Sequence, residues 1–324
     1  MSERYNLVYM GTPDFSVGAL DAIIGAGHRV SLVFTQPDRP AGRGGKLRAS
    51  PVKIRAQELG LEICQPTTLK GEKGAEARAL LQSVEPDALI VAAYGLILPQ
   101  SVLDIPRLGA LNIHASLLPR WRGASPIQAA IKAGDSKTGV TIMKMDAGLD
   151  TGPMLLKREI DIAPDATAGT LHDELAALGA DLAVEVLDDA ARFLAGAEPQ
   201  PDESTYAPML KKSDGRVDWH LSAIALHNHI RAMTPWPGAQ SVLAGVPVRI
   251  IETSLSYDNS LGGQRTCSPG EIVGFEGESA LVAAGDGFVK IVEVQPAGKR
   301  PMPVARFFQG RRLELPQSFV NIAS

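Results

Sequence analysis

Short apolar runs alternate with helical segments through the first half of this chain, and this alternation is what most limits its fold. The apolar runs lie at residues 7–10, 30–34, 88–93 and 108–113. Helical spacing is found between them, at residues 17–24, 52–59 and 75–84. Strands that alternate with helices form parallel sheets that the helices cover. We therefore predict a Rossmann-like α/β fold, with a mostly parallel sheet and helices on both faces.

The sheet is expected to end differently from how it begins. Residues 140–145 and 154–162 are apolar runs with no helical segment between them, which predicts a hairpin-like addition. Residues 171–194 are rich in Ala, Leu, Asp and Glu and are expected to form one long amphipathic helix. That helix would complete the first domain.

The remainder of the chain predicts a second, smaller domain. Residues 196–204 are polar and proline-rich without periodicity, as in a linker, so we place the domains at 1–205 and 206–324. A helix is expected at 222–233. Short strands with glycine turns are expected at 241–243, 246–251, 271–273, 280–283 and 288–294. Their spacing predicts a C-terminal β-barrel similar to the oligonucleotide-binding (OB) fold.

Composition narrows the functional class. A chain of 324 residues is long enough for two cores, and 45% hydrophobic with 21% charged residues is typical of a globular protein. No signal peptide or membrane span is visible, so a cytoplasmic protein is expected. The net charge of −4 excludes a uniformly basic nucleic-acid binder but leaves local basic patches open.

Three polar residues predict the chemistry. Asn112 and His114 are two residues apart at the end of an apolar run, so on a strand their side chains point to the same side. Asp150 lies in the glycine-flanked loop of the expected hairpin. An amide donor, an imidazole and a carboxylate can together hold a developing oxyanion and move a proton. The trio therefore indicates attack on a carbonyl carbon.

Two rival interpretations of these motifs are weaker. A metal site is disfavoured because no second histidine or cysteine lies near His114 at a metal-binding spacing. The turn at residues 11–15 follows a strand but lacks the second and third glycines of a dinucleotide-binding loop. Asp150 taken alone would be only a turn residue.

A basic, glycine-rich stretch predicts a loop that closes on a partner, although a solvated surface loop explains it equally well. It contains one acid, Asp38, and six cations: Arg39, Arg43, Lys46, Arg48, Lys53 and Arg55.

The chain resembles the enzymes that transfer a formyl group from 10-formyltetrahydrofolate, along nearly its whole length. Residues 114–123, 139–143 and 148–152 resemble the shared core of that family. Residues 34–44 and 93–99 resemble the signature of its tRNA-directed branch, and 231–238 the start of that branch's second domain. The resemblance implies that Asn112, His114 and Asp150 are the catalytic residues.

The same resemblance implies the substrates. Ser116, Leu117, Leu118 and Pro119 would form part of the site for the folate co-substrate, and no metal is implied. Arg43, with Lys46 and Arg48, would contact the initiator Met-tRNA, whose α-amine would receive the formyl group for translation initiation. The enzyme would act as a monomer. Further phosphate contacts could come from second-domain cations: Lys211, Lys212, Arg216, Lys299, Arg300, Arg306, Arg311 and Arg312.

Two alternatives stay open at this point. A formyltransferase acting on glycinamide ribonucleotide or a sugar nucleotide would share the trio, although the basic loop and second domain argue against the purine enzyme. An RNA-binding protein on an inactive core would not need to keep Asn112, His114 and Asp150.

Overall fold

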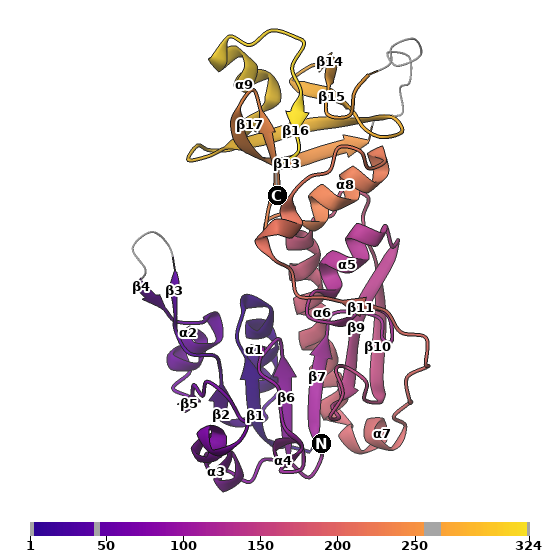
Figure 1. Ribbon diagram of the computed structural model, residues 1–324. Helices are drawn as coiled ribbons and strands as arrows, with labels where there is room; N and C mark the ends of the chain where they lie inside the picture. Colours follow the sequence, from indigo (N-terminus) through magenta and orange to yellow (C-terminus); the bar gives the residue numbers. More distant parts are fainter. Residues whose placement is uncertain (1–2, 42–45, 256–266, 323–324) are drawn as a thin grey trace. The chain divides into compact units, whose positions relative to one another are not determined.

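The computed structural model describes residues 3–41, 46–255 and 267–322 and divides the chain into two compact units (Figure 1). Unit 1 comprises Met1–Gly123, Thr138–Ile160 and His172–Ala207. Unit 2 comprises Ala124–Lys137, Asp161–Leu171 and Pro208–Ser324. Two short segments of the predicted first domain thus pack with the C-terminal part, and a single boundary at residue 206 stays a prediction.

Unit 1 is built on a mostly parallel sheet, which confirms the predicted fold class. Its order is β10-β9-β7-β6-β1-β2-β5. The strands are β1 (Asn6–Gly11), β2 (Arg29–Phe34), β5 (Ile63–Cys64), β6 (Ala88–Ala92), β7 (Ala110–His114), β9 (Lys137–Lys144) and β10 (Met154–Asp161). The pairs from β5 through β7 are parallel, and β9 runs antiparallel to β7.

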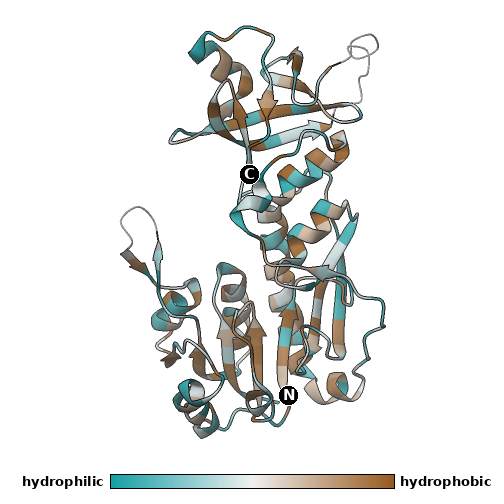
Figure 2. Ribbon diagram, viewed as in Figure 1, coloured by the Kyte–Doolittle hydropathy of each residue, from teal (hydrophilic) through white to brown (hydrophobic). Residues whose placement is uncertain are grey.

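Helices bury both faces of this sheet. They are α1 (Val17–Gly25), α2 (Pro51–Glu58), α3 (Ala75–Ser83), α4 (Gln100–Leu103), α6 (Ala168–Asp188) and α7 (Ala190–Ala195). Successive residues 7–11 of β1 are all buried, which requires cover on both sides. Leu81 of α3 belongs to the same core cluster as Val8 and Met10. The strands of unit 1 are accordingly largely hydrophobic in Figure 2.

A glycine brings α6 unusually close to the strand that carries the predicted site. A Cβ on Gly179 would lie 2.7 Å from a methyl group of Ile113 in β7 and would also contact Val140 of β9. Only the absence of a side chain permits this approach. Helix α6 therefore packs directly against β7 at Ile113.

Two local expectations are corrected. The single helix expected at 171–194 is interrupted at Asp189, whose φ of −144° and ψ of 53° are not helical, so α6 ends and α7 begins there. The basic stretch contains two short antiparallel strands, β3 (Arg39–Ala41) and β4 (Lys46–Arg48), and its last two cations, Lys53 and Arg55, lie on α2, so it is not a loop throughout. The pairing of these strands is a tertiary outcome that the glycine-rich composition does not indicate.

Unit 2 contains the predicted antiparallel β-domain. Its strands are β12 (Ala239–Leu243), β13 (Val246–Leu255), β14 (Ile272–Glu276), β15 (Ser279–Ala283), β16 (Phe288–Pro296), β17 (Met302–Pro303) and β18 (Phe319–Val320), in the order β14-β15-β16-β13-β12-β18 with β17 on β16. A bridge between Glu271 and Ser318, just before β14 and β18, joins the two ends of this order. The sheet therefore curls back on itself as a small barrel does.

Helices complete unit 2. They are α5 (Pro126–Ala133), α8 (Ala223–Ala232) and α9 (Val304–Arg311), and α5 packs against α8. The indole of Trp219 is fully buried, with its ring centroid 5.0 Å from that of Phe319. In neither unit does a described helix have the length and apolar character needed to cross a membrane.

Candidate active site

Hydrogen bonds to one backbone carbonyl connect the carboxyl ends of the parallel strands β1, β2 and β6. The Tyr94 oxygen, just after β6, accepts hydrogen bonds from Thr12 Oγ1 at 2.9 Å and from Gln36 Nε2 at 3.0 Å. Thr12 follows β1 and Gln36 follows β2. The Tyr94 phenol lies in the core, and burial raises its pKa above the usual range. This edge is where ligands bind in open α/β sheets.

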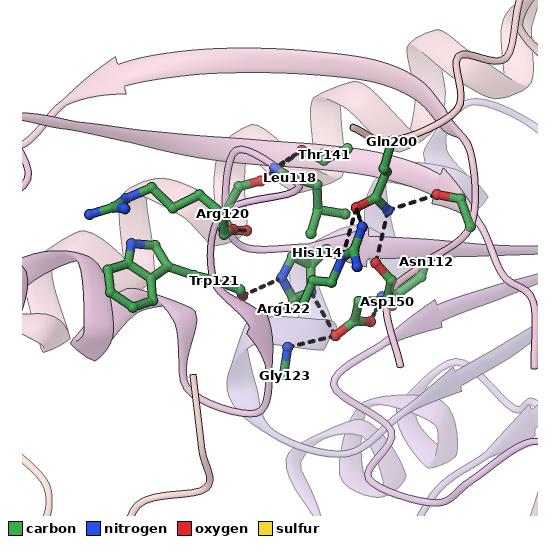
Figure 3. A network of polar contacts seen from close by, with 12 residues as sticks. Asn112, His114, Leu118, Arg120, Trp121, Arg122, Gly123, Thr141, Asp150 and Gln200 are labelled. Atoms are coloured by element: carbon green, nitrogen blue, oxygen red, sulfur yellow. Dashed lines mark hydrogen bonds and ion pairs between the residues drawn. The ribbon is translucent and has the colours of Figure 1, made fainter. Parts of the chain in front are cut away.

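The structure brings Asn112, His114 and Asp150 together at the neighbouring end of β7 (Figure 3). Asn112 Nδ2 lies 3.4 Å from Asp150 Oδ1, and His114 Nδ1 lies 3.7 Å from Asp150 Oδ2. Asn112 and His114 point to the same side of β7, as their spacing predicts. The loop between β9 and β10 supplies Asp150, although 38 residues separate it from Asn112.

Both ring nitrogens of His114 face oxygen acceptors. Nε2 lies 3.0 Å from the Trp121 carbonyl oxygen, which can only accept, so Nε2 carries a proton. Nδ1 faces the Asp150 carboxylate. His114 Nδ1 is therefore the ring nitrogen that can exchange a proton or hydrogen bond with a reacting group, while Nε2 is bound to the Trp121 carbonyl.

Burial strengthens these interactions without closing the site. The side chains of His114 and Asp150 are 6% and 13% exposed. At 3.4 and 3.7 Å, the contacts of Asp150 with the other two residues are longer than good hydrogen bonds. The three side chains therefore point toward a common position, where a substrate oxygen or a water molecule can bind to them.

The turn directly after β7 contains the residues expected to bind folate. Thr141 of β9, which is fully buried, donates from Oγ1 to the Ser116 carbonyl at 2.7 Å and accepts from the Leu118 amide at 3.2 Å. Ser116 Oγ donates to the Arg120 carbonyl at 2.6 Å. Ser116 and Leu118 are buried, whereas Leu117 and Pro119 are partly exposed. Chain connectivity thus places the 116–119 turn beside the trio.

Four residues around the trio, Trp121, Arg122, Gly123 and Gln200, form polar contacts that were not anticipated from the sequence. The Gly123 amide donates to Asp150 Oδ2 at 2.8 Å, and Trp121 supplies the carbonyl that meets His114. Gln200 and Arg122 form a further hydrogen-bonded pair behind the Asp150 loop (Figure 3). Gln200 lies in the segment interpreted as a linker, where no periodic signal identifies it. Backbone groups such as those of Trp121 and Gly123 leave no residue-type signal at all.

The predicted tRNA contacts are not part of this cluster. Arg43 lies outside the described residues. Lys46 and Arg48 belong to β4 in the two-stranded β3–β4 sheet, which is separate from the sheet carrying Asn112, and Arg48 is exposed. Their role stays a prediction.

A basic groove lies on unit 2. Its volume is about 570 Å³, and its lining includes three cations and an indole that is 52% exposed, but no acidic side chain. The cations are Lys212, Arg249 and Lys299, and the indole is Trp236. Lys212 and Lys299 are among the second-domain cations predicted from sequence. Positive charge combined with an aromatic face is suited to a single-stranded or looped nucleic acid.

The two histidines of α8, His227 and His229, are buried. His227 Nδ1 is 2.9 Å from Thr253 Oγ1 and its Nε2 donates to the Pro164 carbonyl at 2.9 Å. His229 is buried, and desolvation, assisted by the nearby charge of Lys132, lowers its pKa to about 4. Across the described ranges, no three His, Cys, Asp or Glu side chains are grouped to hold a metal ion.

Family models match both parts of the chain. A model described as formyl transferase matches residues 5–187, and one described as formyl transferase, C-terminal domain, matches residues 209–312. Together they include Asn112, His114 and Asp150 and all strands of the β-domain except β18.

Curated relatives match nearly end to end. A methionyl-tRNA formyltransferase of Alcanivorax borkumensis is 50% identical over 305 residues, covering 94% of this chain and 91% of the relative. One of Dechloromonas aromatica is 48% identical over 314 residues, covering 97% of this chain and 98% of the relative. The solved structure of WlaRD, a sugar 3N-formyl transferase, covers 92% of this chain and 100% of its own, with a TM-score of 0.62 and 17% identity, which supports the fold alone.

Proposed function

Because the chain belongs to the formyl transferase family through both its N-terminal and its C-terminal domain, we propose that it formylates initiator Met-tRNA. The formyl donor is 10-formyltetrahydrofolate and the acceptor is the α-amine of the methionyl group. The convergence of Asn112, His114 and Asp150 at the carboxyl edge of the sheet supports the chemistry. Similarity to methionyl-tRNA formyltransferases over more than nine-tenths of the chain supports the acceptor.

The transfer needs no covalent enzyme intermediate. The neutral α-amine attacks the formyl carbon, a new N–C bond forms, and the carbonyl oxygen becomes an oxyanion. Asn112 Nδ2 and His114 Nδ1 donate hydrogen bonds to this oxyanion, where one well-placed donor contributes about 3 kcal/mol. The bond between the formyl carbon and the folate nitrogen then breaks, releasing tetrahydrofolate.

Asp150 acts on the proton that must leave the amine. Its carboxylate accepts from the Gly123 amide and faces both His114 and Asn112. It therefore orients the imidazole and can pass the amine proton to the departing folate nitrogen, directly or through water. The roles assigned to Asn112, His114 and Asp150 do not depend on which proton transfer comes first.

The two substrates would approach through different parts of the chain. The turn at residues 116–119, which Thr141 holds rigid, would seat the folate next to the trio. Arg43, together with Lys46 and Arg48 of β4, and the basic groove of unit 2 would contact the tRNA. The enzyme would act in the cytoplasm as a monomer.

Formyl transfer to different acceptors tests this function directly. Purified protein is incubated with 10-formyltetrahydrofolate and either Met-charged initiator tRNA, glycinamide ribonucleotide or an amino-sugar nucleotide. Formyl-methionine should form from the tRNA alone. Formylation of a nucleotide acceptor in its place would support the alternative enzymes, and no transfer to any acceptor would support the non-catalytic alternative.

A further inference from the structure

We infer that Gln200, oriented by Arg122, is the positioning residue that sets where the Asp150 carboxylate lies against His114 and Asn112. The inference rests on the proposed roles of those three residues. Nothing in the motifs around Asn112, His114 or Asp150 indicates a partner some 50 residues downstream of Asp150. The contacts that carry it lie entirely within unit 1.

The Asp150 loop needs to be held from outside. Asp150 has a φ of 53°, in the left-handed region that residues with a side chain seldom adopt. Such a conformation persists when the surroundings determine it. Gly152, two residues on, has no room for a Cβ because it would collide with the Lys144 carbonyl oxygen. Contact with the Lys144 carbonyl therefore restricts the loop at Gly152, and the conformation of Asp150 depends on hydrogen bonds from other residues.

Gln200 supplies those partners on both sides of Thr151. Its Nε2 donates to the Asp150 carbonyl at 2.8 Å and to the Gly152 carbonyl at 2.7 Å, so both amide hydrogens are used (Figure 3). The two bonds fix the direction of the main chain at the residue whose carboxylate faces His114. A small rotation there would move the carboxylate relative to the 3.7 Å contact with Nδ1.

Arg122 determines which way the Gln200 amide points. Its Nε and Nη2 donate to Gln200 Oε1 at 2.9 and 2.7 Å, so the oxygen faces the guanidinium and the nitrogen faces the loop. The next residue, Gly123, donates its amide to Asp150 Oδ2 at 2.8 Å. The dipeptide Arg122–Gly123 thus holds the carboxylate directly and, through Gln200, the main chain behind it.

The segment bearing Gln200 is itself anchored at both ends. Glu198 forms a β-bridge with Met154 at the start of β10. Downstream, β11 (Tyr206–Ala207) pairs in parallel with β8 (Arg122–Gly123). Residues 196–204, which the sequence indicates as a linker, therefore form a strap across the Asp150 loop within unit 1.

Gln200→Glu separates the two faces of this side chain. Glutamate keeps an oxygen for Arg122 but replaces both donors to the Asp150 and Gly152 carbonyls with an acceptor. The kcat for formylation of Met-tRNA should fall at least about tenfold, while KM for each substrate stays within about threefold. Gln317→Glu is the matched control, because Gln317 Nε2 also donates to a backbone carbonyl, that of Glu314 in unit 2; its kcat should be unchanged.

Combination with Asp150→Asn tests whether Gln200 acts through Asp150. The double variant should be no slower than Asp150→Asn within about twofold, because the carboxylate that Gln200 positions is already gone. If the kcat losses of the two single variants multiply in the double variant, Gln200 has a general structural role and the inference is overturned. A normal kcat in Gln200→Glu would also overturn it. Thermal unfolding of Gln200→Glu shows whether the variant folds. If it does not, Arg122→Lys decides, with an expected loss of about threefold to tenfold in kcat; an unchanged kcat in Arg122→Lys would equally overturn the inference. Full activity of Asp150→Asn would instead refute the site assignment on which the proposed function depends.

Discussion

At the scale of single residues, the site depends on donors aimed at one point rather than on an intrinsically reactive side chain. Asn112 and His114 approach it from β7, and Asp150 approaches it from the loop after β9. Fixed donors in a partly desolvated site stabilise developing charge without reorganising during the reaction. Each donor should therefore contribute to turnover far more than to binding.

Asn112→Ala and His114→Ala should each lower kcat by about a hundredfold or more, because each removes a hydrogen bond made mainly in the transition state. Single-turnover formylation of Met-tRNA measures the effect, and Met-tRNA binding should change little. His172→Ala, a histidine on α6 outside the site, is the control and should retain full activity. Near-normal single-turnover rates in either site variant would contradict the assignment.

At the scale of elements, the turn after β7 depends on a residue from the neighbouring strand. Thr141 lies opposite His114 in the antiparallel β7–β9 pair, so its hydroxyl reaches the main chain of residues 116–118. One strand end therefore carries both the imidazole and the turn proposed to seat the folate. A change in β9 should alter folate binding without removing any catalytic group.

Thr141→Val should raise KM for 10-formyltetrahydrofolate and lower the free energy of unfolding by about 1–3 kcal/mol, because the buried Leu118 amide loses its partner. Steady-state kinetics and denaturant unfolding measure the two effects. Thr138→Val makes the same atomic change on the opposite face of β9 and should leave KM for the folate unaltered. An unchanged folate KM in Thr141→Val would remove the 116–119 turn from the folate site.

At the scale of the whole molecule, the two units carry different parts of the proposed function. Unit 1 holds the trio and its supporting strap, whereas unit 2 presents the groove lined by Lys212, Arg249, Lys299 and Trp236. An acidic chain with a net charge of −4 can bind a polyanion when its cations are gathered in this way.

Arg249→Ala should raise KM for Met-tRNA about threefold to tenfold and reduce the salt dependence of tRNA binding by roughly one phosphate contact. Turnover at saturating tRNA and KM for the folate should be unaffected. Arg192→Ala, an exposed arginine of α7 paired with Asp189, is the control. Unaltered affinity and salt dependence in Arg249→Ala would exclude the groove from the tRNA interface.

The stability of the protein should decrease at mildly acidic pH because of α8. Burial lowers the pKa of His229 to about 4 in the folded protein, below its usual value of 6.5, and burial also lowers the pKa of His227. Below pH 6.5 the unfolded chain therefore binds a proton that the folded chain does not, so stability is complete above 6.5 and falls toward pH 4. His229 alone accounts for a loss of about 3 kcal/mol over this range.

Denaturant unfolding of the wild type and His229→Gln between pH 7.5 and 4 measures this contribution. The variant should show a visibly shallower pH dependence, because glutamine does not titrate there. Parallel curves for the two proteins would show that His229 does not contribute.

The sequence by itself determined the mostly parallel sheet, the antiparallel β-domain and the orientation of Asn112 and His114 toward the same side of their strand. These follow from local periodicity, since side chains two residues apart on a strand share a face. Only the tertiary structure decided the distances at which the predicted partner Asp150 meets them, that the supposed linker holds the Asp150 loop through Gln200, and that Trp121 and Gly123 contribute backbone groups. The physical reason is that contacts between residues far apart in the chain, and contacts made by the main chain, depend on how the elements pack. The types and order of neighbouring residues therefore predict neither kind of contact.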